Sequence, residues 1–230
     1  MEERAGGEPE RPVPDAVRVQ ILATEHWSLL ATRQLAWNEA FSRAGIFLTV
    51  LSAAVVALAL VAQTGSDRDF RLFALVLLPV VLFLGVATYF RLGAINAEDG
   101  RLLIGMNRLR RGYLDIAPDL QPYFITGATD DLEGLDRTAG FDGTYRRRGM
   151  PALVLVSTPV IVGVLDGVIA GVLCGVVVQA AGGTGGLAVG LGVVAALLVL
   201  ALLAVHPARQ ISSFTRDYVP RFPSPPPGAG

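Results

Sequence analysis

Four long apolar stretches alternate with polar segments along the chain. They cover residues 45–63, 72–90, 153–181 and 187–205. Each is close to or above the roughly 20 residues that an α-helix needs to cross the hydrocarbon core of a bilayer. Four helices of this kind in a chain of 230 residues cannot all be buried in a soluble core. The pattern therefore predicts an all-α, polytopic membrane protein with four transmembrane helices in contact with the lipid bilayer.

Helical stripes of apolar residues lead into the first span and out of the second. Residues 15–44 contain neither Gly nor Pro, and the segment 91–116 is ended by Pro118. In both segments apolar residues recur at alternating steps of three and four, which is the pattern of a helix-packing seam. We therefore expect both segments to be helical and to pair as an antiparallel cytoplasmic stalk, packed like a coiled coil.

Two polar residues, Gln34 and Asp99, occupy seam positions that are otherwise apolar. A polar residue in a helix seam fixes register and partner at some cost in stability. We therefore expect specified pairing, either within one chain or between copies. The predicted seam residues are Trp27, Leu30, Gln34, Trp37, Phe41, Ile95, Asp99, Leu102, Met106 and Leu109.

The remaining polar segments have no sustained periodicity. Residues 1–14 are predicted to be a disordered tail, and residues 117–150, which are rich in Gly, Pro and Asp, a cytoplasmic loop or short irregular cap. Residues 206–230 are predicted to be a cytoplasmic tail, with about the last ten, RFPSPPPGAG, disordered.

The distribution of arginine predicts the orientation. The segments before the first span, between the second and third, and after the fourth hold 17 of the 19 arginines, and the two other loops hold 2. Positively charged segments stay in the cytoplasm. We therefore expect a multi-pass protein of the plasma (inner) membrane with both termini cytoplasmic. The topology anchor before the third span is Arg146, Arg147 and Arg148.

Composition narrows the chemistry further. The net charge of −1 gives no electrostatic reason to expect a nucleic-acid partner, and the absence of lysine excludes a phosphate-binding P-loop. The lack of lysine, together with the abundance of Ala, Gly and Val, is typical of a high-GC bacterium. The acidic cluster at Asp130, Asp131, Glu133 and Asp136 lacks the spacing of an EF-hand calcium loop. We therefore expect no enzymatic chemistry, no metal and no cofactor.

The third span carries a charged residue inside a glycine-rich helix. Asp166 lies in the apolar run, beside glycines that repeat every four residues like a glycine zipper. In the structural interpretation, which we favour, the groove holds the fourth span and Asp166 is protonated or hydrogen-bonded. In the functional one, Asp166 is a cation or proton site. The groove residues are Gly163, Gly167, Gly171 and Gly175.

The segment EHWSLLATRQLAWNEAFSRAGIFLTVLSAAVVALALVAQ, residues 25–63, resembles part of a group of uncharacterised bacterial four-span membrane proteins. More distantly, the architecture of residues 15–116 is similar to two-span effector modules of nucleotide-signalling defence systems. That similarity would imply regulated membrane permeabilisation, although the spans after Met150 depart from it.

Taken together, these patterns predict a small integral membrane protein that acts by assembly, for example as a homo-oligomer, or by interaction with a protein partner that the sequence does not identify. The alternative is an oligomeric ion- or proton-conducting channel that uses Asp166 in the third span.

Overall fold

The protein is built from helices. The computed structural model describes residues 13–63, 65–140 and 157–225, and every regular element in those ranges is helical. Four helices are long and apolar enough to cross a membrane, which confirms the all-α class and indicates a multi-pass membrane protein. The elements are α1 (Asp15–Ala62), α2 (Asp67–Ile116), the 3-10 helix η1 (Pro118–Tyr123), α3 (Leu132–Thr138), α6 (Thr158–Ala180) and α7 (Gly185–Asp217).

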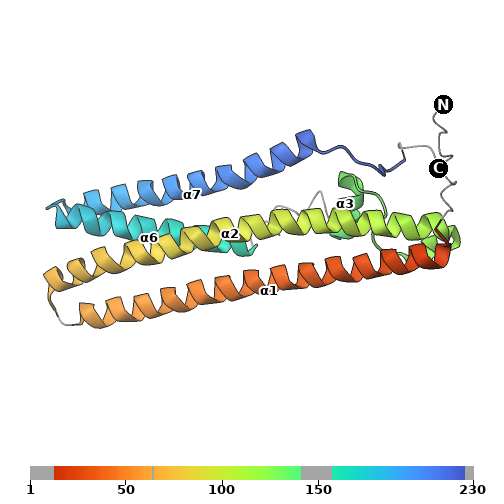
Figure 1. Cartoon of the computed structure of the whole chain (residues 1–230). Coiled ribbons are helices and arrows are strands. Elements are labelled where there is room, and N and C mark those ends of the chain that lie inside the picture. Colours follow the sequence, from red (N-terminus) through yellow and green to blue (C-terminus); the bar gives the residue numbers. More distant parts are fainter. Residues whose placement is uncertain (1–12, 64, 141–156, 226–230) are drawn as a thin grey trace, which may run out of the picture.

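Helices α1 and α2 form a hairpin that extends beyond the shorter α6–α7 hairpin (Figure 1). α1 has 48 residues, which corresponds to roughly 70 Å at 1.5 Å per residue. The turn between α1 and α2 contains Gly65 at a positive φ of 71°, and the Ser66 hydroxyl caps α2 by accepting a hydrogen bond from the backbone of Asp69. The turns of both hairpins lie at the same end of the molecule.

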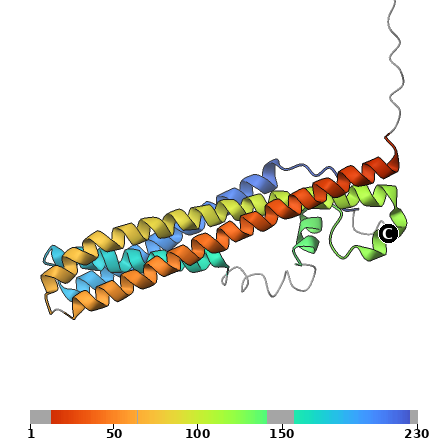
Figure 2. The same ribbon diagram turned by 60° about the horizontal axis from the view of Figure 1, so that its bottom comes forward.

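The four long helices pack in the order α1–α2–α6–α7 (Figures 1 and 2). α1 packs against α2, α2 also packs against α6, and α6 packs against α7. The core therefore runs along α2 and α6, with Phe47 of α1, Val81 of α2 and Val162 of α6 among its most buried side chains. α1 lies at one edge of this row, and α2 is its principal neighbour.

The glycine column of α6 lies in the contact with α7. A Cβ atom at Gly171 would lie 2.8 Å from the carbonyl oxygen of Gly192, and one at Gly167 would lie 2.9 Å from Leu200. Gly175 faces the backbone of Ala188 at ordinary contact distance. The small residues thus let two backbones approach closely, as expected of a helix pair in lipid. Gly163, at the other end of the column, faces the ring of Tyr89 on α2 as well as Leu203 on α7.

The seam between α1 and α2 follows a different line on α1 from the predicted one. Trp27 and Phe41 are 71% and 62% exposed, and Leu30 and Gln34 are exposed as well. Of the α1 residues predicted for the seam, only Trp37 is partly buried against α2. The prediction that the other four pack between α1 and α2 is therefore wrong for this pair.

Glycines on α2 explain the displacement. Leu29 lies over Gly105 and Leu22 over Gly112, so two leucines seven residues apart fill two recesses seven residues apart. This register turns Trp27 and Phe41 of α1 away from α2. On α2, of the residues predicted for the seam, Ile95, Asp99 and Met106 are buried, and Leu102 and Leu109 are partly buried.

Several boundaries differ from those predicted. α6 begins at Thr158, and residues 153–156 as well as Arg146, Arg147 and Arg148 lie outside the described residues. α7 continues as a helix past the predicted end of its span at residue 205 to Asp217. Within the segment expected to be a loop, η1 and α3 form a small cap on α2. Residues 221–225, predicted to be disordered, are placed against this cap.

Candidate functional site

Asp166 is completely buried where α6 packs on the α1–α2 hairpin. Its exposed fraction is 0%, and neither carboxyl oxygen has a hydrogen-bond partner among the described residues. A Cβ atom at Gly85 of α2 would overlap this carboxyl group and would lie 2.8 Å from the ring of Phe47 on α1. Gly85 therefore makes the space that the side chain of Asp166 occupies.

An unpaired carboxylate in such surroundings is strongly disfavoured, because its charge loses hydration without gaining a partner. This packing therefore favours the protonated, neutral form of the side chain. Even the neutral group carries a penalty of about 1–3 kcal/mol for its unmade hydrogen bonds. The arrangement can hold a proton, and it can release that proton only if water or a polar group reaches the carboxyl group.

A second polar cluster ties α1 to α2 in the stalk, which comprises residues 15–44 and 91–116. The carboxylate of Asp99 accepts hydrogen bonds from Arg33 Nε at 2.6 Å, from Arg33 Nη2 at 3.3 Å and from Trp37 Nε1 at 3.1 Å. Asp99 was predicted as a polar seam residue, but its partners are Arg33 and Trp37, whereas Gln34 is exposed. Charge-assisted, two-point pairing of this kind fixes the register of two helices.

A third cluster holds the C-terminal end of the described chain. We call residues 129–131 the clasp and residues 218–225 the strap. Asp130 of the clasp is 0% exposed and accepts hydrogen bonds from the strap backbone, at 2.7 Å from Phe222 N and 3.0 Å from Arg221 N. The Tyr218 hydroxyl donates to it at 3.0 Å, and Arg108 Nε of α2 donates at 2.8 Å.

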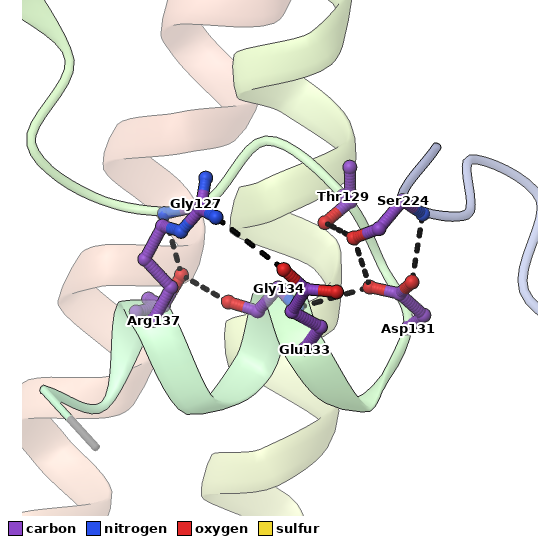
Figure 3. A network of polar contacts seen from close by, with 8 residues as sticks. Gly127, Thr129, Asp131, Glu133, Gly134, Arg137 and Ser224 are labelled. Atoms are coloured by element: carbon purple, nitrogen blue, oxygen red, sulfur yellow. Dashed lines mark hydrogen bonds and ion pairs between the residues drawn. The ribbon is translucent and has the colours of Figure 1, made fainter. Parts of the chain in front are cut away.

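Asp131 binds the strap at Ser224 (Figure 3). Its carboxylate accepts hydrogen bonds from Ser224 N at 2.7 Å and from the Ser224 hydroxyl at 3.1 Å, while the hydroxyls of Ser224 and Thr129 lie 3.0 Å apart. The same carboxylate accepts from Gly134 N at 2.9 Å and so caps the N-terminus of α3. One side chain thus both starts the cap helix and binds the strap.

The clasp rests on a buried amide of α2. Asn107 donates from Nδ2 to the carbonyl of Thr129 at 2.8 Å, and its Oδ1 accepts from Arg110 and from the Thr138 hydroxyl of α3. Asn107 is fully buried, and these bonds use both its amide nitrogen and its amide oxygen. Hydrogen bonds through Asn107 therefore connect the clasp to α2 and α3.

Hydrogen bonding decides the charge of the clasp. Burial alone would raise the pKa of Asp130, but hydrogen bonds from the backbone of Arg221 and Phe222, with those from Arg108 and Tyr218, hold that pKa below its ordinary value. The pKa of Asp131 is likewise lowered: burial opposes this, but donors from Ser224, Gly134 and Thr129 outweigh it. Both groups are ionised acceptors at neutral pH.

No group of three or more His, Cys, Asp or Glu side chains able to hold a metal ion occurs among the described residues. The residues of the acidic cluster instead have different partners. Asp130 and Asp131 bind the strap, while Glu133 pairs with Arg137 on α3 at 3.5 Å. Sequence analysis missed this arrangement, because the strap lies some 90 residues further along the chain and its composition resembles a disordered tail.

The exposed apolar face of α1 is the fourth feature. Trp27, Gln34, Phe41 and Leu48 repeat every seven residues, and Leu30 lies between the first two. Each of them is exposed, although four of the five are large and apolar. We call these five residues the α1 stripe. Large exposed apolar side chains that recur along one face of a helix are typical of an interaction site.

No protein-family model, curated protein or solved structure matches the chain. The interpretation of its function therefore depends on the geometry of these four features.

Proposed function

We propose that this chain is a multi-pass membrane protein, with both termini in the cytoplasm, that works by self-assembly through the α1 stripe. The observation that carries the proposal is the exposure of Trp27, Phe41 and their neighbours on a helix whose other apolar side is already occupied by α2. The arginine distribution supports the orientation, and it places the stalk on the cytoplasmic side.

The spacing of the α1 stripe favours a second copy of α1 as its partner. Trp27, Gln34 and Phe41 occupy one heptad position and Leu30 the other, whereas Trp37, the next residue at that second position, is bonded to Asp99 of α2. The exposed residues thus repeat every seven residues along one line, as in helices that pair as a coiled coil. Copies inserted in the same membrane share one orientation, and a two-fold axis perpendicular to the bilayer would set their α1 helices parallel. Gln34 would then meet Gln34 of the second copy, where the two amides can hydrogen-bond and fix the register.

The flank of the α1 stripe does not oppose such pairing. Ala31, Asn38 and Gly45 follow one edge at seven-residue intervals, and all three are exposed. They are small and uncharged, so another helix can approach closely without bringing like charges together. A Cβ atom at Gly45 would meet nothing within 4 Å, which leaves room beside the stripe at the start of the apolar half of α1.

Disulfide formation between single cysteines tests this proposal. We expect Gln34→Cys, in a Cys174→Ala background, to give a covalent dimer when membranes are treated with an oxidant. Thr32→Cys is the matched control, because Thr32 is exposed on the opposite side of the same helix. Equal yields from both variants, or no dimer from Gln34→Cys, would refute the proposal.

A proton-conducting oligomer is the second candidate. The observation that favours it is the fully buried carboxyl group of Asp166, for which the described part of the chain offers neither oxygen a hydrogen-bond partner. A residue of this kind inside a membrane is a candidate for ion transfer. Vesicles containing the protein should then acidify faster than empty vesicles under a proton gradient, and Asp166→Asn should abolish the difference. Asp67→Asn, which makes the same charge change at an exposed site in the first turn of α2, is the control. Equal flux through wild type and Asp166→Asn would exclude this use of the site.

A further inference from the structure

We propose that the clasp is a binding site for an extended peptide segment, that the chain fills it with its own strap, and that the strap can be released while the helices stay folded. This goes beyond self-assembly, because it concerns how α7 is connected to the cap and to α2. It also needs only one copy of the chain.

The clasp recognises main chain. Backbone N–H groups of Arg221, Phe222 and Ser224 all donate to its two carboxylates, and the backbone N–H of Asp130 donates in return to the carbonyl of Phe222 at 3.1 Å. An exchange of this kind between an extended segment and a fixed turn resembles strand addition, in which main-chain bonds supply affinity. The ligand class is therefore an extended peptide with free amide groups at three of four consecutive residues.

The strap has few apolar contacts, which favours its release. Val219 is 79% exposed, Pro223 and Pro225 are exposed and Phe222 is 37% exposed, while Tyr218 and Pro220 are partly buried. The contact therefore depends mainly on hydrogen bonds to two ionised groups, with a smaller contribution from apolar burial. Segments with few buried apolar contacts open at low free-energy cost, well below that of global unfolding. The α6–α7 contact differs in that glycines let the two helices pack closely along their length.

Release of the strap would remove the connection between the C-terminal end of α7 and the clasp. α7 ends at Asp217, and Tyr218, the next residue, already donates to Asp130. Arg108 of α2 binds both Asp130 and the Tyr218 hydroxyl, so this one arginine connects α2, the clasp and the strap. With the strap bound, the end of α7 is tethered to the cap. With the strap free, the tether is lost and the clasp is open to another extended segment.

Limited digestion with trypsin tests the proposal on the full chain in detergent micelles. The scissile bond is Arg221–Phe222, whose N–H group is bonded to Asp130, and its cleavage removes the nine residues FPSPPPGAG. A bound strap cannot adopt the conformation that the protease requires, so wild type should be cut more slowly than a free peptide of residues 216–230. Asp130→Asn should accelerate cleavage about tenfold or more, because loss of a hydrogen bond to a charged group is worth at least that factor.

The control is Glu133→Gln, which makes the same change of charge on an exposed residue of α3 that does not hold the strap. Mass spectrometry identifies the product, and circular dichroism measures helix content in the same samples. Faster cleavage in Asp130→Asn alone, with helix content unchanged, supports the proposal. Equal rates in wild type and free peptide, or in the two variants, would overturn it, and so would loss of helix in Asp130→Asn, because the clasp would then be part of the fold.

A second measurement traps the bound state directly. The hydroxyl oxygens of Thr129 and Ser224 lie 3.0 Å apart, so the pair Thr129→Cys and Ser224→Cys should form an intrachain disulfide on oxidation. Pairing Thr129→Cys with Val219→Cys is the control, because the Val219 side chain is exposed. The first pair should close, and the disulfide should suppress cleavage at Arg221. Failure of the first pair to close faster than the control would overturn the proposal.

Discussion

Replacement of Gly85 by alanine tests whether Asp166 is buried against α2. The new Cβ atom would lie 2.8 Å from Phe47 Cε2 and would overlap the carboxyl group of Asp166, whereas real Cβ contacts are ordinarily at 3.4–4 Å. Overpacking of a core costs typically about 1–3 kcal/mol. The same substitution gains about 1 kcal/mol of helix propensity. Gly93→Ala, on the same helix but with nothing within 4 Å of the new atom, measures that gain alone.

Thermal unfolding in detergent, followed by circular dichroism, compares the two variants. We expect Gly85→Ala to be less stable than Gly93→Ala by the steric term of about 1–3 kcal/mol, which corresponds to roughly 2–12 °C in Tm for a chain of this size. In an Asp166→Ala background the difference should shrink, because the carboxyl group that meets the new atom is gone and only the ring of Phe47 remains close. The reasoning is wrong if the difference between the variants is absent, or if it is the same in both backgrounds.

Two further predictions concern the polar clusters. Asp99→Ala should lower the free energy of unfolding by about 1.5–3 kcal/mol, because Arg33 and Trp37 lose their charged acceptor. Thermal unfolding measures this loss. A loss no larger than that of Asn96→Ala, at an exposed site of the same helix, would contradict the prediction. Acid should free the strap: the pKa values of Asp130 and Asp131 are lowered, so their contribution is complete above the ordinary value of 3.8 and is lost as the pH falls through the lowered values. A nitroxide on Val219→Cys in a cysteine-free background should be restricted at neutral pH and mobile in strong acid; mobility that does not change between the two conditions would contradict the sign.

Hydropathy identified the four long apolar helices, because a run of about 20 apolar residues, the length that a bilayer demands, is rare elsewhere in a chain. The same reasoning placed the seam of α1 on its most apolar stripe, which includes Trp27 and Phe41. The structure uses the neighbouring face, where Leu22 and Leu29 fill recesses above glycines of α2. Which face of α1 packs on α2 depends on how its side chains fit the surface of α2. The periodicity of α1 alone does not carry that information.

Long-range polar contacts were beyond sequence analysis for a similar reason. Asp99 was recognised as a polar interruption of an apolar seam, but its partner Arg33 lies 66 residues away, and no pattern in the sequence links the two. The strap was judged by composition, which is rich in proline and poor in apolar residues. Its placement comes from the buried carboxylate of Asp130 and the partly buried one of Asp131, which need donors that only a folded chain brings near.

The absence of a break in α1 has a mechanical consequence. The helix runs from Asp15 to Ala62 without a joint, and Phe47, which touches the space around Asp166, belongs to the same rod as Trp27. No break in the helix separates the two residues, so a partner that rotates the end of α1 near Trp27 acts on Phe47 through one continuous helix. We therefore expect binding at that end of α1 to affect the packing around Asp166.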